Sequence, residues 1–309
     1  MILKRILFIA LFLAITTLRA FSSEIYIYAT INNEIITNHD IKKEQEYLKI
    51  LNPDLAKLDD KKLFLIGKNA LINQIIKKKE ISKIFDLQKE NPLLDKVFKD
   101  MYTNLNFKSE NQFNNSLQKK NNYTTDEVRD KLKIEVYWND LIFKKYRKLV
   151  KIDKKALIKK IKTQKNNFVN EYLLSEIFFN KKKEKNLNDQ IENIKQSIIE
   201  IGFNNTANIY SVSESAKYGG KIGWINENNL SELIYDELRK KEMGQYTDVI
   251  QISNNFLILK IEDKRSKEIL IDEEKQLDEL LIYERNRQLT QFSSIYFNKV
   301  KINYSINEK

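Results

Sequence analysis

The stretch that decides the fold runs from Tyr210 to Trp224 and reads YSVSESAKYGGKIGW. The chain of 309 residues contains only six glycines, and three of them, Gly219, Gly220 and Gly223, fall within five positions here. A chain uses glycine where its backbone must take a positive φ or approach another group closely. We therefore predict one tightly shaped loop at this point, with a strand beginning directly after it.

The loop resembles the parvulin family of peptidyl-prolyl isomerases, whose members carry a phrase of the type F-S-x-x-x-S-A-x-x-G-G-x-L-G-W. The matching positions are Tyr210, Ser211, Ser215, Ala216, Gly219, Gly220, Ile222, Gly223 and Trp224. The order of the surrounding elements supports the resemblance: a strand over 172–179, a helix that ends at Gly202, the loop, a helix over 231–241, and strands over 249–252 and 256–261. The resemblance covers about residues 172–263 and implies a small, mostly antiparallel sheet flanked by helices.

The chain before this region is predicted to be mostly helical. Residues 25–36 alternate around Asn32 and Asn33, a pair that tolerates the positive φ of a tight hairpin turn. Thr124 and Glu127 form a capping box that starts a helix with apolar residues at helical spacing. Similar patterns predict helices over residues 39–51, 59–85, 92–103, 106–121 and 151–164.

The phrase ATINNEIITNHDI, residues 29–41, resembles the opening of the SurA-type periplasmic chaperones, and the helical block resembles their N-terminal domain. In that family the tail of the chain returns to complete the N-terminal domain, with parvulin modules inserted between. The resemblance implies that a helix over 272–292 and a terminal strand carrying Val300, Ile302 and Tyr304 pack on the N-terminal domain. This chain carries one parvulin copy, whereas the best-known arrangement has two.

We therefore expect an α+β fold in four parts. Residues 1–22 form a signal peptide, and residues 23–168 form a SurA-like N-terminal helical chaperone domain. Residues 169–265 form the parvulin-like domain. Residues 266–309 form a C-terminal helix and strand that pack on the N-terminal domain.

The expected leader has the three regions of a signal peptide. Lys4 and Arg5 supply the positive start, and residues 6–18 form an apolar run that is shorter than the about 20 residues of a membrane span. Ala20 and Ser22 are small residues at the positions that a signal peptidase recognises, so we expect cleavage after Ser22. The mature protein is then exported to the periplasm without a stable membrane span; retention of the leader as an anchor is the alternative.

Composition excludes several kinds of site. The net charge is +11, but the 54 Lys and Arg are spread along the chain without a recognisable nucleic-acid fold, so we expect no nucleic-acid partner. The chain has no cysteine, which excludes disulfides, thiolate metal sites and cysteine nucleophiles. The single histidine, His39, cannot form a histidine zinc site alone, and we expect it to be a solvated residue in the first turn of a helix. We expect no metal and no cofactor.

The parvulin resemblance also implies positions for the catalytic groups. Parvulins resemble one another in placing two histidines on adjacent central strands, beside a Cys or Asp. Here the first histidine position falls on Glu176 in the phrase SEIF, the second falls on Leu257 in NFLILK, and the Cys or Asp position falls at about Ser213. Both histidines are therefore replaced, and whether the chain is an enzyme stays open.

The resemblance places a proline-binding cup at Leu230 and Ile234, and we include Phe256 as a third peptide-binding position. Glu176 is either a general base in some other chemistry or, as we favour, a solvated or salt-bridged strand residue. Ser213 has no histidine partner in its own domain, which argues against a nucleophile.

Three functions fit the sequence. The leading hypothesis is an exported, ATP-independent folding chaperone whose partners are unfolded exported polypeptides, by resemblance outer-membrane β-barrel proteins, with a parvulin domain degenerate in catalysis. The second is an active parvulin-type prolyl isomerase. The third is a membrane-tethered or anion-binding envelope scaffold, suggested by the +11 charge.

Overall fold

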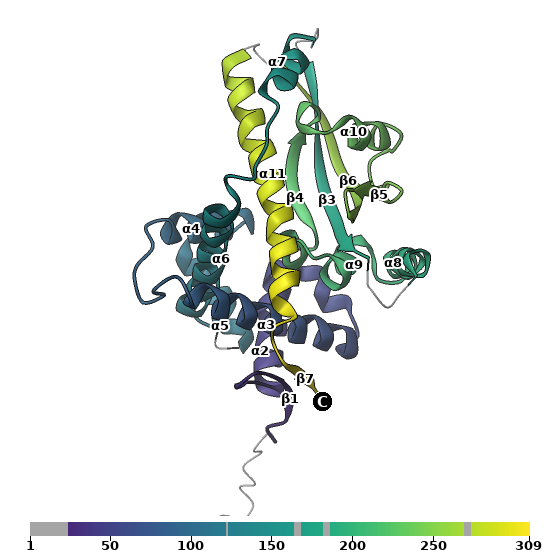
Figure 1. Ribbon diagram of the computed structural model, residues 1–309. Helices are drawn as coiled ribbons and strands as arrows, with labels where there is room; N and C mark the ends of the chain where they lie inside the picture. The colour runs from purple at the N-terminus through teal and green to yellow at the C-terminus, as the bar shows by residue number, and fades with distance from the viewer. Residues whose placement is uncertain (1–23, 122, 164–167, 182–185, 269–272) are drawn as a thin grey trace, which may run out of the picture.

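The computed structural model describes residues 24–121, 123–163, 168–181, 186–268 and 273–309. Two lobes lie along one long helix, α11 (Glu273–Lys301), which runs the length of the molecule (Figure 1). The expected signal peptide lies outside the described residues. In the part of the chain that is described, no helix has the length and hydropathy needed to cross a membrane. The mixture of long helices and two small antiparallel sheets confirms the expected α+β class.

The helical lobe opens with the expected hairpin, β1 (Ile27–Ile31) and β2 (Glu34–Thr37), which turns at Asn32 with φ of 51°. Capping boxes start two of its helices, because the side chains of Thr37 and Thr124 accept hydrogen bonds from the backbone three residues on. His39 is exposed in the first turn of α2, as expected. The helical elements are α2 (Asn38–Leu51), η1 (Pro53–Lys57), α3 (Asp60–Ser82), α4 (Leu94–Asn104), α5 (Glu110–Asn121) and α6 (Thr125–Tyr146).

The C-terminal part of α11 and the strand β7 (Ile306–Glu308) belong to the same lobe. Tyr296 and Val300 of α11 pack around the buried Trp138 in its core, and β7 pairs antiparallel with β1. The predicted strand at residues 300–304 is wrong in position. Val300 keeps the helical spacing from Tyr296 and is 5% exposed, so core packing extends α11 to Lys301 and moves the strand to residues 306–308.

The sheet lobe comprises the described residues between 168 and 268. Its sheet has the strand order β4-β3-β6-β5, and every neighbouring pair is antiparallel. The helix α9 was not predicted; it follows α8 directly because Gly202, with φ of 82°, turns the chain between the two. The elements are β3 (Phe168–Asn180), α8 (Leu187–Ile201), α9 (Phe203–Tyr210), η2 (Glu214–Tyr218), β4 (Lys221–Asn226), η3 (Glu227–Asn229), α10 (Glu232–Leu238), β5 (Ile250–Ile252) and β6 (Asn255–Glu268), preceded by α7 (Lys154–Thr163).

Apolar residues cover both faces of this sheet, because successive strand residues point to opposite sides. One face packs against α10, and its core includes Phe178 of β3 and Leu257 of β6. The other face packs against α8 and α9, and its core includes Phe179 and Phe256. At the far end of β6, residues 263–268 are mostly charged, which protects an edge that pairs only with β3 from pairing with other strands.

Candidate functional site

Two of the three family positions meet at one corner of the sheet lobe. Ser215 donates a hydrogen bond to the carboxylate of Glu176, with an Oγ–Oε1 distance of 2.8 Å. The hydroxyls of Ser215 and Ser213 lie 2.6 Å apart, and those of Ser213 and Ser211 lie 2.9 Å apart. The backbone N–H of Phe178 donates to Ser211 Oγ at 3.0 Å. Ser211, Ser213 and Ser215, which we call the serine relay, tie the glycine loop to Glu176 and Phe178 of β3.

The environment of Glu176 differs from the one that we favoured from the sequence. The side chain is half-buried, it makes no ion pair within the described residues, and it accepts a hydrogen bond from Ser215. Burial raises the pKa of Glu176, and the hydrogen bonds from Ser215 and Ser213 only partly oppose that rise. Burial also raises the pKa of Tyr283 on α11, and the nearby charge of Glu176 adds to it. Among the described residues, the family positions at this corner hold one carboxyl group and one hydroxyl, Glu176 and Ser213, in place of histidine and Cys or Asp.

The third family position lies in a packed core. Leu257 pairs with Phe178 across β6 and β3 and is 5% exposed. The two predicted cup residues, Leu230 and Ile234, belong to the same core cluster and are 4% and 8% exposed. Leu257 and the two cup residues are therefore packed in one core cluster and expose little surface to a ligand.

Phe256 does not join this set, which corrects the prediction. It lies on the opposite face of the sheet, where its ring stacks on that of Phe179 with the centroids 5.5 Å apart. A strand places neighbouring residues on opposite faces, so Phe256 and Leu257 cannot both point toward the cup. Phe256 therefore belongs to the core beneath α8 and α9.

The glycines of the loop allow two close approaches. Gly220 has φ of 79°, and a Cβ there would lie 2.3 Å from the carbonyl oxygen of Glu176. Gly219 has φ of 72°, and a Cβ there would lie 2.9 Å from the side chain of Asn204 and 3.1 Å from that of Asn52. Since Asn52 belongs to the helical lobe, the family's glycine pair here brings the loop against both lobes at once.

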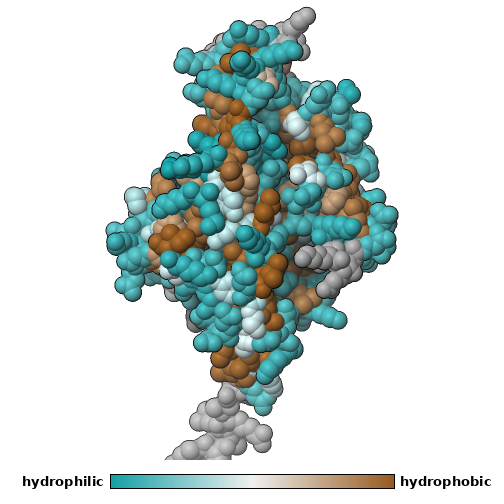
Figure 2. Space-filling model, in the orientation of Figure 1, coloured by the Kyte–Doolittle hydropathy of each residue, from teal (hydrophilic) through white to brown (hydrophobic). Residues whose placement is uncertain are grey.

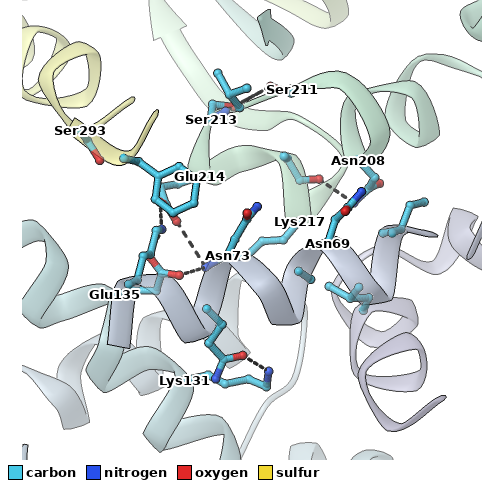
Figure 3. A pocket seen from close by; sticks show the side chains of 18 of the residues that line it. Asn69, Asn73, Lys131, Glu135, Asn208, Ser211, Ser213, Glu214, Lys217 and Ser293 are labelled. Atoms are coloured by element: carbon cyan, nitrogen blue, oxygen red, sulfur yellow. Dashed lines mark hydrogen bonds and ion pairs between the residues drawn. The ribbon is translucent and has the colours of Figure 1, made fainter. Parts of the chain in front are cut away.

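A cavity of about 190 Å³ lies between the loop and the helical lobe (Figure 3). Asn69 and Asn73 of α3 stand on one side of it, opposite the loop that carries Ser211 and Ser213 (Figure 3). Ser294 of α11 also lines the cavity, and its buried hydroxyl has no hydrogen-bond partner among the described residues. The cavity therefore combines apolar walls with amide and hydroxyl groups, which can bind the N–H and C=O groups of a polypeptide.

Four charged side chains border the cavity and join the lobes. We call them the interlobe quartet: Lys77 of α3, Glu135 of α6, and Glu214 and Lys217 of η2. Glu135 accepts from Lys77 at 3.0 Å and lies 3.6 Å from Lys217. Figure 3 labels Glu135, Glu214 and Lys217 beside the cavity. Glu214 pairs with Lys77 and lies 3.8 Å from Lys217. Each carboxylate therefore has one lysine partner from each lobe.

The two carboxylates of the quartet are not equivalent. Burial acts to raise the pKa of Glu135, but the charges of Lys217 and Lys77 outweigh it and hold that pKa well below its usual range. For Glu214, burial and the charge of Glu135 together raise the pKa. Burial acts to lower the pKa values of Lys77 and Lys217, yet the two carboxylates outweigh it and raise both. Glu135 is therefore the anion that both lysines hold, and Glu214 is the carboxyl that takes up a proton more readily.

Reasoning from the sequence missed the cavity and the quartet. Lys77 stands in the run Lys77–Lys79, and nothing in that run singles out the one lysine that becomes buried. The only available signal is the spacing of Glu214 and Lys217, which stand three residues apart inside the family phrase.

Comparison with known proteins finds related sequences over both lobes. Residues 169–263 match the family model described as the PPIC-type PPIASE domain (Rotamase). Residues 30–168 match the model NST1, described as a salt tolerance down-regulator. The chaperone SurA of Hydrogenovibrio crunogenus is 25% identical over 199 residues, which are 56% of this chain and 43% of that protein. The chaperone SurA of Pseudomonas putida is 40% identical over 65 residues, 20% of this chain and 15% of that protein.

The periplasmic chaperone PpiD of Haemophilus influenzae is 29% identical over 55 residues, 18% of this chain and 9% of that protein. The chain thus spans less than half of the length of these curated relatives. Among solved structures, a SurA-like chaperone from the study of PEB4 and Cj1289 of Campylobacter jejuni is 18% identical, with 92% of this chain and 98% of that chain covered and a TM-score of 0.35. The sequence matches confirm the resemblance to SurA-type chaperones with a PpiC-type parvulin domain.

Proposed function

We propose that the chain is an exported, ATP-independent folding chaperone that acts in the periplasm on unfolded outer-membrane β-barrel proteins. In this proposal residues 1–22 are the cleaved signal peptide, residues 23–168 with 266–309 form the chaperone domain, and residues 169–265 form a parvulin-type domain that binds polypeptide without catalysing prolyl isomerisation. The observation that carries the proposal is the replacement of the histidine pair by Glu176 and the buried Leu257 in an otherwise retained domain.

Loss of catalysis follows from what isomerisation requires. Rotation about an X-Pro bond crosses a barrier of about 18–20 kcal/mol, and a catalyst lowers it with a shaped pocket and hydrogen bonds tuned to the twisted amide. Here the cup residues Leu230 and Ile234 are buried against Leu257. The hydroxyls of the serine relay bond to one another and to Glu176, so they are already engaged.

The surface and the family resemblance support the proposed class of client. Strands of outer-membrane barrels alternate apolar and polar residues and are rich in aromatic residues. Figure 2 shows a mostly hydrophilic surface with a broken apolar band along the path of α11. Ile282 and Ile295 of α11, and Ile302 directly after it, are 49%, 54% and 76% exposed. Covering such side chains with an apolar client yields roughly 25 cal/mol per Å².

A second candidate function is active prolyl isomerisation, and the serine relay is the observation that favours it. A carboxyl group with a raised pKa, such as Glu176, holds a proton more readily than an ordinary glutamate and can donate a hydrogen bond. Placed beside Ser213, it offers a replacement for the family's hydrogen-bonded network.

One assay separates the two candidates. Prolyl isomerisation is measured without a coupled protease on the mature protein, with Ile234→Lys as a control for contaminating isomerases. The same samples are then tested for suppression of the aggregation of an unfolded outer-membrane barrel protein. A background isomerisation rate together with suppression of aggregation supports the chaperone. An isomerisation rate that Ile234→Lys abolishes would show that the protein is a prolyl isomerase. Failure to suppress aggregation would refute the chaperone proposal.

A further inference from the structure

The loop of the sheet lobe is held against the helical lobe by charge, and this contact surrounds the cavity. Lys77 is 8% exposed as a whole residue, and its ammonium also lies 5.5 Å from the centre of the Trp138 ring. Charged side chains taken out of water are retained only when each has partners, and removal of one partner leaves the others unpaired. The quartet therefore ties the position of η2 to that of α3 and α6.

Other contacts between the lobes are uncharged or exposed. Tyr218 of η2 packs against the core cluster of the helical lobe that includes Tyr47 of α2. Asn52, between α2 and η1, donates to Asn208 of α9 at 2.6 Å, and Asn205 donates to the carbonyl of Asp54 at 3.3 Å. An exposed ion pair, Lys62 of α3 with Glu200 of α8 at 3.7 Å, also joins the lobes. The quartet is the more buried set of charges between them, and acid or substitution can change it.

We propose that the interlobe quartet is a latch that holds the glycine loop against the helical lobe, and that its release opens the cavity to a polypeptide. The latch itself is a property of the two lobes, and only its role in client access rests on the proposed function. Release separates η2 from α3 and α6, which makes the half-buried Asn73 and the buried Ser294 accessible beside Asn69, which is already exposed.

We predict opposite effects on lobe opening for substitution of the two carboxylates. In Glu135→Gln both lysines lose the anion that they share, so we expect the lobes to open. In Glu214→Gln the amide removes one negative charge beside Glu135, so we expect the lobes to stay closed or to close further. A latch that depended only on the number of ion pairs would open in both variants.

A matched control lies in the same cavity. Glu44 of α2 is 4% exposed and binds Lys131 of α6 at 2.6 Å, but both residues belong to the helical lobe. Glu44→Gln therefore removes a buried carboxylate from the cavity wall without cutting a contact between the lobes.

The distance between the lobes can be measured directly because the natural chain has no cysteine. Lys57→Cys in η1 and Lys195→Cys in α8 replace side chains that are 77% and 40% exposed, and spin labels on the pair report the separation without any client. We expect the ratio of open to closed populations to rise about tenfold in Glu135→Gln, to stay unchanged in Glu44→Gln, and to stay unchanged or fall in Glu214→Gln. An unchanged distribution in Glu135→Gln, or opening of the same size in either of the other two, overturns the latch.

The labelled chain with its natural quartet gives a second test that needs no substitution in the interface. The groups that face the quartet from the packed elements are Glu44 and Tyr47 of α2, Lys131 of α6 and Tyr218 of η2, while α11 contributes the hydroxyls of Ser293 and Ser294. Because docking raises the pKa of Glu214, the closed population should first grow as the pH falls from neutral. Because docking lowers the pKa of Glu135, the closed population should shrink in stronger acid. A closed population that only shrinks from neutral pH downward overturns the assignment.

Access is then tested with the client. Glu135→Gln should bind an unfolded barrel protein faster than the natural chain if release admits it. If the lobes open in Glu135→Gln but the client does not bind faster, the role of the latch in client access is wrong and the latch itself is still supported. If neither the natural chain nor any variant binds the client, the proposed function is refuted instead.

Discussion

The two sides of the glycine loop are built from different chemistry. Toward β3 the loop presents the serine relay, a set of neutral hydroxyls ending on the single carboxyl of Glu176. Toward the helical lobe the same loop presents Glu214 and Lys217, which pair with buried charges of α3 and α6. The side where parvulins resemble one another in their catalytic groups has lost its titrating pair, and the opposite side has four charges. This contrast indicates that the charged groups of the loop serve the contact between the lobes in this chain.

The largest expected effect comes from a substitution in the glycine loop that disturbs its contacts on both sides. In Gly220→Ala the new Cβ would lie 2.3 Å from the carbonyl oxygen of Glu176 at a φ of 79°, so the backbone must move. We expect the free energy of unfolding in urea to fall by about 3 kcal/mol. Gly223→Ala is the matched control, because φ there is 84° but nothing lies within 4 Å, and it should cost about 1 kcal/mol. Equal losses in the two variants would show that close approach is not what the loop requires.

The next effect is specific to the side that faces the helical lobe. Tyr218→Ala removes a half-buried ring from the helical core cluster that includes Tyr47, and we expect a loss of about 2 kcal/mol in the free energy of unfolding. Tyr218→Phe keeps the ring and should stay within about 0.5 kcal/mol of the natural chain. If the two substitutions cost the same, packing of the ring does not anchor the loop.

A smaller effect distinguishes the two carboxylates by pH. At pH 7 we expect Glu135→Gln to lower the free energy of unfolding by about 1–2 kcal/mol, since its side chain is only 24% exposed and holds two lysines. The pKa of Glu135 is depressed in the fold, so its contribution is present above the usual carboxyl pKa of 4.5 and is lost as the pH falls toward the folded value. The difference between variant and natural chain should therefore vanish in strong acid. A difference that does not depend on pH would mean that the loss comes from packing.

The smallest effect is on the side of the serine relay and has the opposite sign. Burial raises the pKa of Glu176 above 4.5, so its contribution to stability is present below the unfolded pKa and is lost as the pH rises through the folded value. Glu176→Gln stays neutral and should raise the free energy of unfolding by about 0.5 kcal/mol at pH 7, with no gain at pH 4. Thermal unfolding at the two pH values measures this, and a loss of stability at pH 7 would contradict it.

Much of the fold could be predicted because local signals were strong. The Thr124 capping box, the turn at Asn32 and the loop glycines each specify a conformation within a few residues. The missed features depend on contacts distant in sequence. Val300 continues a helix because its partner Trp138 lies on α6, and Lys77 is buried because η2 of the other lobe covers it. Phe256 is a different case, because it directly precedes Leu257 on β6 and the alternation of a strand already places it on the opposite face.

The pairing of β7 with β1 has a consequence for the order of folding in the proposed export. A chain exported from its N-terminus, as proposed, delivers β1 early and β7 late, so the β2-β1-β7 sheet and the α11 part of the helical core cannot close until late in translocation. The sheet lobe between residues 168 and 268 emerges as one continuous stretch and needs no such delay. The module between the two halves of the helical lobe is then the first to fold, and it stays tethered to an unfinished partner whose apolar surfaces are still open.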